Sequence, residues 1–327
     1  MKRAITVLGL SLGLAIATPA TAHDVKSHEG KADQAPPLDA EGIYKAFGWD
    51  MDGVEIKTEK VADGLYVLFG NGGNIAVSVG EDGTLIVDDQ FPQLMPKIKA
   101  ALKEIGSEKV DFVINTHWHF DHADGNMALG KDGTWIVSQS NSREKMLDDH
   151  IINLGFVAYE QKAYPKHARS DITYDKTMQF HINDQQIDLL HVGPAHTTGD
   201  TAVIFRGANA VHLGDVFNNS GYPFVDADNG GDITGMIAFC QAVHDTINND
   251  TKVIPGHGAV TTRAKLARYI EVLTTIRDRV QAMIDEGKGL DAIVAAQPTA
   301  EFDKEFYGAE VTTTAFLGRV YASLTRE

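Results

Sequence analysis

The chain has 327 residues, a formal net charge of −16, and a composition that is 43% hydrophobic and 23% charged. This composition excludes a disordered, fibrous or disulfide-stapled protein, and the acidic balance opposes binding to nucleic acid because like charges repel. The single cysteine, Cys240, excludes an internal disulfide and a thiolate metal cluster.

The N-terminus has the pattern of a secretory signal peptide. A short basic head precedes an apolar run at 4–17, which is shorter than the ~20 residues that a membrane-spanning helix needs. Residues 20–22 (ATA) then supply a small-residue cleavage signature. We expect residues 1–22 to be removed between Ala22 and His23, leaving no stable membrane anchor and a protein in the periplasm or secreted. An uncleaved N-terminal anchor is the alternative.

The rest of the chain divides into a leader, a main domain and a C-terminal piece. Residues 23–45 are polar and lack periodicity, so we expect a flexible leader. Residues 286–327 have short helical patterns, and we expect a helical appendage packed on the same domain as residues 46–285.

Within 46–285, β-branched or aromatic runs between Gly and Asp turns predict strands, and near-helical spacing of apolar residues predicts helices. The order of these elements favours an α+β sandwich, with two packed sheets and helices outside, over a doubly wound parallel sheet. We expect strands at 65–69, 74–79, 84–87, 110–114, 177–182, 186–192, 201–206 and 210–213, and helices at 93–105, 233–247 and 262–283.

A dense cluster of metal-ligand residue types follows the strand at 110–114. His117, His119, Asp121 and His122 lie within six residues. Side chains alternate in an extended segment, so His117 and His119 point to the same side and can hold one cation. Asp121 and His122 come as the chain turns into a helix and can face a second position. Packed core histidines are the alternative, but four polar groups without partners would be costly to bury.

Further ligand types stand at the ends of other predicted strands. His196, Asp215 and His257 each follow closely on a glycine, which allows tight turns and close approach to a site. Asp88 directly follows the predicted strand at 84–87, so this strand also ends in a ligand type. Together with the 117–122 cluster, these residues supply the donors that an open metal site needs.

Taken in order, these residues resemble the five motifs of the metallo-β-lactamase-fold hydrolase superfamily, over about residues 54–260. The resemblance implies a four-layered αββα sandwich, with residues 46–285 as the catalytic domain. It also implies two metal ions at one edge of the sandwich, bridged by Asp215, with Asp88 orienting the ligands. The implied ligand sets are His117, His119 and His196 for one ion, and Asp121, His122 and His257 for the other.

Imidazole and carboxylate ligands without thiolate suit zinc, with iron or manganese as alternatives. Two zinc ions can share a hydroxide at neutral pH. We therefore expect two Zn²⁺ per chain and attack by that hydroxide, held by Asp121, on an acyl carbonyl.

The ligand pattern narrows the resemblance. Asp215 stands where one group of β-lactamases has Cys, and His122 follows Asp121, as in glyoxalase II, lactonases and other Asp-bridged hydrolases. The chain has no basic C-terminal cluster of the kind that binds glutathione in glyoxalase II. We therefore expect an exported hydrolase of amide, lactam, ester or lactone bonds, with β-lactams as one candidate substrate.

Other activities stay open at this point. A glyoxalase II-like thioester hydrolase and a persulfide dioxygenase with one Fe²⁺ share the motif set. His119 disfavours flavodiiron oxidoreductases, which have Glu at that position, and the acidic charge disfavours nucleases. A non-catalytic metal-binding module is a further alternative.

Residues for substrate binding are expected in two loops. The glycine-rich turn at 70–73 places Asn71 where it could cover the metals. The segment 218–232 is long and lacks a strand or helix pattern, as functional loops often do. From it we expect Asn218, Asn219, Tyr222 and Phe224 to contact a small-molecule acyl substrate. No protein partner can be read from the sequence.

Overall fold

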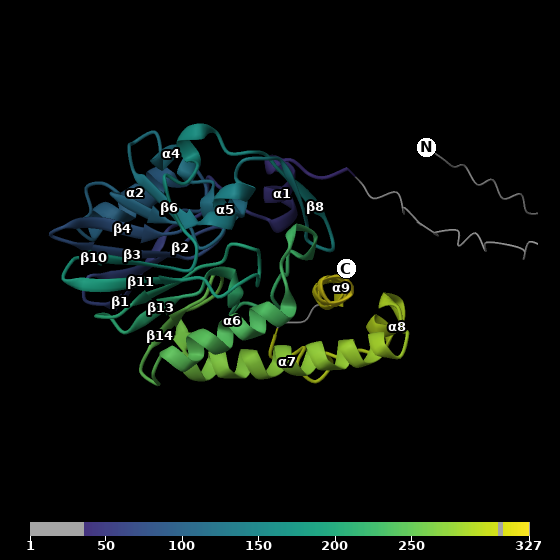
Figure 1. The fold of residues 1–327 in the computed structure, drawn as a ribbon. Helices are drawn as coiled ribbons and strands as arrows, with labels where there is room; N and C mark the ends of the chain where they lie inside the picture. Colours follow the sequence, from purple (N-terminus) through teal and green to yellow (C-terminus); the bar gives the residue numbers. More distant parts are fainter. Residues whose placement is uncertain (1–35, 307–309, 327) are drawn as a thin grey trace, which may run out of the picture. The chain divides into compact units, whose positions relative to one another are not determined.

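The computed structural model describes residues 36–306 and 310–326. Two mixed β-sheets pack face to face, and helices cover the outer face of each (Figure 1). The fold is therefore the α+β sandwich that the sequence predicts. Within the described ranges, no helix is both long enough and apolar enough to cross a membrane.

The first sheet has seven strands, antiparallel from β1 to β4 and parallel from β4 through β5 and β6 to β9. The order of its strands in space is β1 (Lys57–Ala62), β2 (Leu65–Phe69), β3 (Ile75–Gly80), β4 (Gly83–Val87), β5 (Phe112–Ile114), β6 (Trp135–Gln139) and β9 (Ile172–Tyr174).

The second sheet has six strands, which are antiparallel except for the parallel pair β13–β14. Its strands in spatial order are β10 (Thr177–Ile182), β11 (Gln185–Leu190), β12 (Ala202–Phe205), β13 (Ala210–His212), β14 (Lys252–Ile254) and β15 (Thr261–Thr262). A separate hairpin is formed by β7 (His150–Asn153) and β8 (Ala158–Gln161).

Alternating apolar residues on the two sheets make the central core. Val67 and Val87 of the first sheet and Leu189 and Phe205 of the second belong to one cluster of fully buried side chains. Burying such a side chain contributes roughly 1.5–3 kcal/mol. The strand ends beyond this core are therefore held rigidly, which suits them to carry a site.

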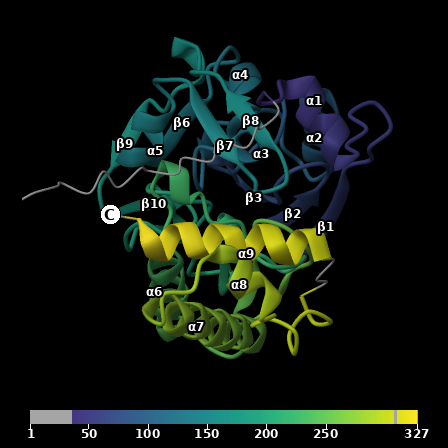
Figure 2. The same ribbon diagram turned by 90° about the vertical axis from the view of Figure 1, so that its right-hand side faces the viewer.

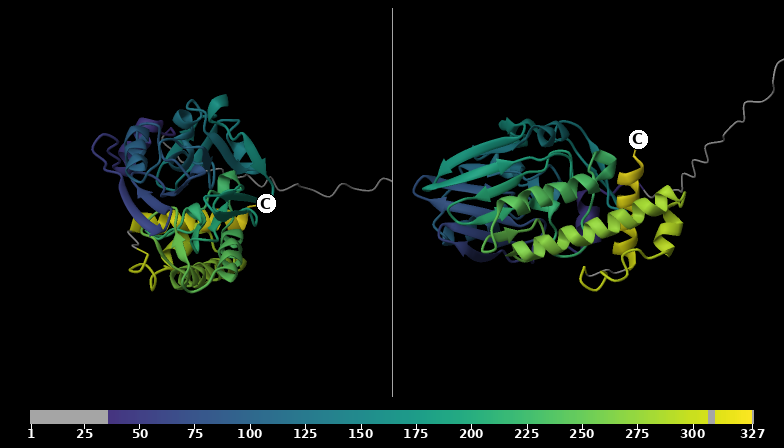
Figure 3. Two further views of the ribbon diagram at one scale, coloured as in Figure 1. Left: turned by 90° about the vertical axis from the view of Figure 1, so that its left-hand side faces the viewer. Right: turned by 60° about the horizontal axis from the view of Figure 1, so that its bottom comes forward.

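Helices α6 (Ile233–Thr246) and α7 (Arg263–Asp285) lie side by side over the second sheet (Figure 3). The outer face of the first sheet is covered by α2 (Met95–Glu104), whose Ile98 and Leu102 are buried there. The short elements are α3 (Phe120–Ala123), α4 (Asn126–Leu129), α5 (Ser140–Lys145), η1 (Lys166–Ala168), η2 (Gly214–Val216) and η3 (Ala227–Asn229).

The C-terminal residues pack against α6 and α7, in the apolar cluster on the outer side of the second sheet. Helix α8 (Leu290–Ala295) contacts α9 (Glu310–Thr325), which lies near α7 (Figure 2). Phe316, Leu317 and Val320 of α9 are buried in the same apolar cluster as α6 and α7. These residues therefore belong to the domain's core.

The last residues of the expected flexible leader, 23–45, are helical in the structure. Residues 40–45 belong to helix α1 (Ala40–Phe47), with Asp39 as its N-cap and Gly48 ending it at a φ of 69°. Ile43 is fully buried in the apolar cluster that also contains α2 residues, and this burial fixes α1 to the same side of the first sheet. A helix of only eight residues, about two turns, gives too little periodicity to be recognised beside a polar segment. Residues 1–35, which include the predicted signal peptide and most of the leader, lie outside the described residues.

Candidate metal centre

The predicted ligands meet at one edge of the sandwich because each lies in a segment that follows a strand. His117 and His119 follow β5, and Asp121 and His122 open α3. His196 lies in the loop after β11. Asp215 lies in η2 after β13, and His257 comes after β14. Their donor atoms form two groups, the first of His117, His119 and His196 and the second of Asp121, His122 and His257. A further set of His117, His122 and Asp215 overlaps both groups, and within each set all donor atoms lie within 4.8 Å of one another.

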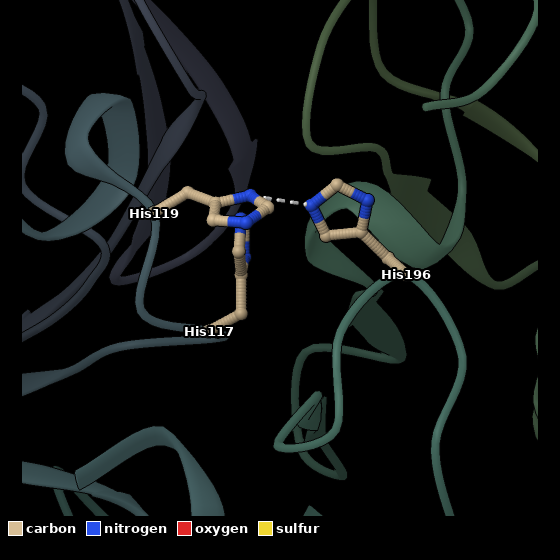
Figure 4. A group of neighbouring side chains, drawn as sticks. All are labelled: His117, His119 and His196. Carbon is tan, nitrogen blue, oxygen red and sulfur yellow. Dashed lines mark hydrogen bonds between the residues drawn. The ribbon is translucent and has the colours of Figure 1, made fainter. Parts of the chain in front are cut away.

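In the first group, two imidazole nitrogens face each other at hydrogen-bond distance. Nδ1 of His119 lies 2.9 Å from Nε2 of His196 (Figure 4). On the far side of the rings, Nε2 of His119 lies 3.0 Å from a carboxylate oxygen of Asp226, and Nδ1 of His196 lies 2.7 Å from the carbonyl oxygen of Phe224. Those acceptors require N–H on the far side of each ring. When both rings are neutral, their two lone pairs converge, as in a cation site.

His117 completes this group with a nitrogen that has no partner. Its Nδ1 lies 3.0 Å from the hydroxyl of Thr116, whereas its Nε2 is buried without a hydrogen bond. Burial, together with the neighbouring His122, His196 and His119, holds the pKa of His117 well below its ordinary value. The ring is therefore neutral, and its free lone pair fits the same cation.

The second group is richer in negative charge. Nε2 of His122 lies 3.2 Å from Nε2 of His257, which in turn lies 3.2 Å from Asp121 Oδ2. Burial lowers the pKa of His257, but Asp215 and Asp121 raise it by more, to about 10. The same carboxylates and Asp88 raise the pKa of the buried His122 well above its ordinary value. This part of the site therefore attracts positive charge strongly.

Asp215 lies between the two groups. Its Oδ1 is 3.1 Å from His122 Nε2 and 3.4 Å from His257 Nε2, and its Oδ2 is 3.7 Å from His196 Nε2. Burial raises the pKa of Asp215, but His257 and His122 lower it well below the ordinary range. One ionised carboxylate thus turns an oxygen toward each group.

Asp88 orients ligands of both groups. Its Oδ2 accepts from Nδ1 of His122 at 2.7 Å and from the hydroxyl of Thr116 at 2.8 Å, and its Oδ1 accepts from the Thr116 amide at 2.7 Å. The Thr116 hydroxyl in turn contacts His117. Asp88 has a φ of 64°, a conformation that Asp and Asn adopt more readily than most residues.

Asp226 is a part of the site that the sequence analysis did not identify. It is 1% exposed and hydrogen-bonds His119, and Asn229 donates to both of its oxygens at 3.0 Å. It lies within the long segment 218–232, which was expected to carry function. That segment's length was the only signal, because no spacing links Asp226 to the histidines.

A cavity of about 310 Å³ opens onto the ligands. Of the residues expected to bind substrate, Asn218, Tyr222 and Phe224 line it. Asn219 does not, since its amide donates to the Ala259 carbonyl at 2.9 Å and it borders a neighbouring cavity. Asn71 does not line it either, because its amide donates to the Asp50 carbonyl at 3.2 Å. For both residues the side chain is already bonded to a backbone carbonyl.

These residues fit a pair of divalent ions. Six imidazole or carboxylate donors in two groups, joined by a shared carboxylate, match the preferences of zinc. Cys240, the only thiol, is buried in α6 and is not among the donors. The facing nitrogens of His119 and His196 and the unpartnered His117 Nε2 are all placed where a cation could bind them.

The chain belongs to the metallo-β-lactamase superfamily of enzymes, whose sequence profile matches residues 68–259. That range contains Asp88 and all seven predicted ligands. Hydroxyacylglutathione hydrolase of Saccharomyces cerevisiae is 24% identical over 215 residues, which cover 64% of this chain and 65% of that protein. Coenzyme F420H(2) oxidase of Methanothermobacter marburgensis is 32% identical over 62 residues, or 18% of this chain and 15% of that protein. The chain thus spans less than two thirds of either relative.

Solved structures share the fold at low sequence identity. The sec-alkylsulfatase Pisa1 from Pseudomonas superposes with a TM-score of 0.62 at 13% identity, covering 81% of this chain and 50% of that one. The DIM-1 metallo-β-lactamase superposes with a TM-score of 0.53 at 16% identity, covering 68% of this chain and 99% of that one. These likenesses establish the fold alone.

Proposed function

We propose that this protein is an exported, zinc-dependent hydrolase that opens acyl bonds of small molecules, either amide and lactam or ester and lactone bonds. β-Lactams are one candidate class. The observation that carries the proposal is the position of Asp215, which turns one oxygen toward His122 and His257 and the other toward His196. A carboxylate shared in this way suits two ions held next to each other, below a cavity open to substrate.

Two zinc ions, when bound, lower the pKa of water to near 7 and stabilise the negative charge that develops on an attacked carbonyl. The residues of the chain hold and orient the reactants. Asp121 lines the cavity, and its Oδ2 also lies 3.2 Å from His257, so it can accept a proton from the attacking water and aim that water at the acyl carbon. The water oxygen adds to that carbon, the bond to nitrogen or oxygen breaks, and the proton passes to the leaving group.

A thioester hydrolase is the second candidate, favoured by the similarity to hydroxyacylglutathione hydrolase. The chemistry of attack is the same, and only the leaving atom differs. We place the protein in the periplasm or outside the cell, on the basis of the basic head, the 4–17 apolar run and the ATA triplet. Mass spectrometry of the mature N-terminus tests this placement, with His23 expected as the first residue.

Metal content tests the proposal most directly. We expect plasma mass spectrometry to find two zinc ions per chain in protein expressed with its signal and purified without chelator. One iron per chain would favour the persulfide dioxygenase alternative, and no metal after reconstitution would overturn the site. His196→Ala and Asp121→Ala should each abolish hydrolysis of acyl substrates while leaving the circular dichroism spectrum unchanged. Full activity in either variant would contradict the assignment.

A further inference from the structure

The main chain around His119 needs support from outside its own segment. His119 is the N-cap residue of α3, with an extended backbone at φ −67° and ψ 149°. An N-cap side chain commonly accepts a hydrogen bond from an amide of its helix. The ring of His119 instead faces His196 and Asp226 and makes no such bond to α3. The first amides of α3 therefore need acceptors from another part of the chain.

Gln161, the last residue of β8, bonds the main chain on both sides of His119. Its Oε1 accepts from the amide of Phe120 at 2.9 Å, and its Nε2 donates to the carbonyl of Trp118 at 2.8 Å. Only one orientation of the side-chain amide satisfies both groups, because the N–H needs an oxygen and the carbonyl needs an N–H. Gln161 is 3% exposed. One buried side chain thus holds the peptide groups before and after this predicted ligand.

A second polar side chain near the Trp118 carbonyl is poorly placed to take over from Gln161. The hydroxyl of Tyr164 lies 3.4 Å from that carbonyl, which is a long contact, and 2.8 Å from Asp124 Oδ1, which is a short one. A hydroxyl has one proton, and the shorter contact is the better acceptor for it. Removing the amide of Gln161 therefore removes the short hydrogen bond of the carbonyl.

The hairpin that carries Gln161 also reaches the ring of His119. Asn229 donates to the carbonyl of Ile151 in β7 at 2.9 Å and to both carboxylate oxygens of Asp226 at 3.0 Å. Asp226 in turn lies 3.0 Å from Nε2 of His119. The main chain and the ring of His119 are thus both connected to the β7–β8 hairpin, which lies outside the two large sheets and beside α3 (Figure 2).

The hairpin has anchors that do not involve the side chain of Gln161. Leu38 donates to the carbonyl of Ala158 at 2.8 Å, and its own carbonyl accepts from the amide of Glu160 at 3.0 Å. Tyr159 is 5% exposed and packs on Phe120 with ring centroids 4.4 Å apart. A change of the Gln161 side chain should therefore loosen the segment around His119 and leave the hairpin in place.

We infer that Gln161 is a positioning residue of the metal centre. Its side-chain amide sets the main chain at His119 and thereby places the His119 ring in the first group of ligands, with His117 and His196. The inference rests on the metal-dependent function proposed above. Partners that orient a ligand are typically worth about 10–100-fold in metal affinity, and we expect a contribution of that size from Gln161.

A matched pair of substitutions separates positioning from general stabilisation. Gln161→Met removes both hydrogen bonds and keeps a flexible side chain of similar size. Gln139→Met is the control, because Gln139 is 4% exposed, is the N-cap of α5 and also bonds two main-chain groups, the amide of Asn141 and the carbonyl of Asp175. Neither Asn141 nor Asp175 lies in a segment with a predicted ligand. Both substitutions should lower the urea midpoint of the apoprotein.

Competition with a chromophoric chelator measures zinc affinity in the full mature chain under native conditions. We expect Gln161→Met to weaken one of two bound zinc ions by about tenfold or more, and Gln139→Met to bind both as the unaltered chain does. Equal zinc affinities in the two variants would overturn the inference. Gln161→Asn and Gln139→Asn form a second pair, which keeps the amide but withdraws it by one methylene group, and the same difference is expected between them.

Cobalt(II) in place of zinc gives a reading that lost stability alone does not change, since its visible absorption depends on the geometry of its ligands. The spectrum should change in Gln161→Met and stay the same in Gln139→Met. Hydrolysis of acyl esters by the unaltered chain, with equal zinc affinities and cobalt spectra in both variants, would overturn the role of Gln161 and leave the proposed function standing. Zinc binding without hydrolysis in the unaltered chain would contradict the function alone, and lower zinc affinity in Gln161→Met than in Gln139→Met would still support the role of Gln161.

Discussion

Arg319 of α9 forms a bidentate ion pair with Asp228. Its Nη2 lies 2.8 Å from Oδ1 and its Nη1 lies 3.0 Å from Oδ2. Asp228 lies two residues beyond Asp226, the carboxylate that orients His119. The Nη1 of Arg319 also donates to the Asn153 carbonyl of β7 at 3.2 Å. The last helix of the chain thus fixes a loop that lies 91 residues earlier in the sequence and that positions a candidate metal ligand.

We predict that Arg319→Met weakens the first ligand group. Arg319 is 6% exposed, and loss of its charge-assisted hydrogen bonds should lower the free energy of unfolding by about 1–3 kcal/mol. The loosened loop should also lower zinc affinity at His117, His119 and His196, as measured by competition with a chromophoric chelator. Arg279→Met is the control, since Arg279 pairs with the exposed Glu301 and its hydrogen bonds go to Glu301 and Pro298, not to this loop. Equal zinc affinity in both variants would show that α9 does not support the site.

A second prediction concerns Asp88, the carboxylate that orients residues of both ligand groups. Asp88→Asn keeps the side chain's shape and tolerates the φ of 64°, but it removes the negative charge that accepts from His122 and Thr116. Such orienting partners are typically worth 10–100-fold in metal affinity. We expect a loss of that size for zinc, with a folded apoprotein by circular dichroism. Asp188→Asn, at a sheet position paired with Arg206, should bind zinc as the unaltered chain does.

The residues that meet in the candidate metal centre could be predicted from the sequence because their positions follow from local rules. His117 and His119 alternate in an extended segment, and the other ligands stand just beyond apolar runs with turn glycines. Strands such as β2 (Leu65–Phe69) and β10 (Thr177–Ile182) were predicted at their exact bounds because they lie between clear turn sequences.

The remaining features depend on contacts between distant segments. Strand β6 (Trp135–Gln139) and the hairpin of β7 and β8 carry short or mixed runs that pair only once their neighbours are in place. The role of Asp226 depends on a hydrogen bond to a residue 107 positions earlier. Asn71 and Asn219 were expected in the cavity on loop position alone, and backbone carbonyls elsewhere hold both side chains.

Gly73 offers a way to impair the second ligand group selectively. A Cβ added there would lie 2.2 Å from Cε1 and 2.4 Å from Nδ1 of His122, so the ring, whose Nδ1 hydrogen-bonds Asp88, must shift. We predict that Gly73→Ala lowers the zinc content from two ions to one per chain. Gly289→Ala is the matched control, because nothing lies within 4 Å of its Cβ position. Two tightly bound zinc ions in Gly73→Ala would mean that His122 is not required as a ligand.

The final prediction uses the single thiol as a reporter of folding. Cys240 is fully buried in α6, and its Sγ donates to the Val216 carbonyl at 3.3 Å. Burial, with a smaller contribution from Asp200, raises the pKa of this thiol well above its ordinary value. The reactive thiolate is therefore absent from the folded chain throughout pH 7–9, whereas in the unfolded chain it titrates near its usual pKa of about 8.5.

We expect Ellman's reagent to leave the folded chain unlabelled at pH 8 and to label one thiol per chain after denaturation. Zinc binds the folded chain preferentially, so it should slow labelling at a fixed, mildly destabilising urea concentration, by a factor that grows with free zinc. Rapid labelling of the native chain, rising with pH around 8.5, would contradict burial of Cys240. Labelling that zinc leaves unchanged would instead contradict the coupling between the metal centre and the stability of the core that contains α6.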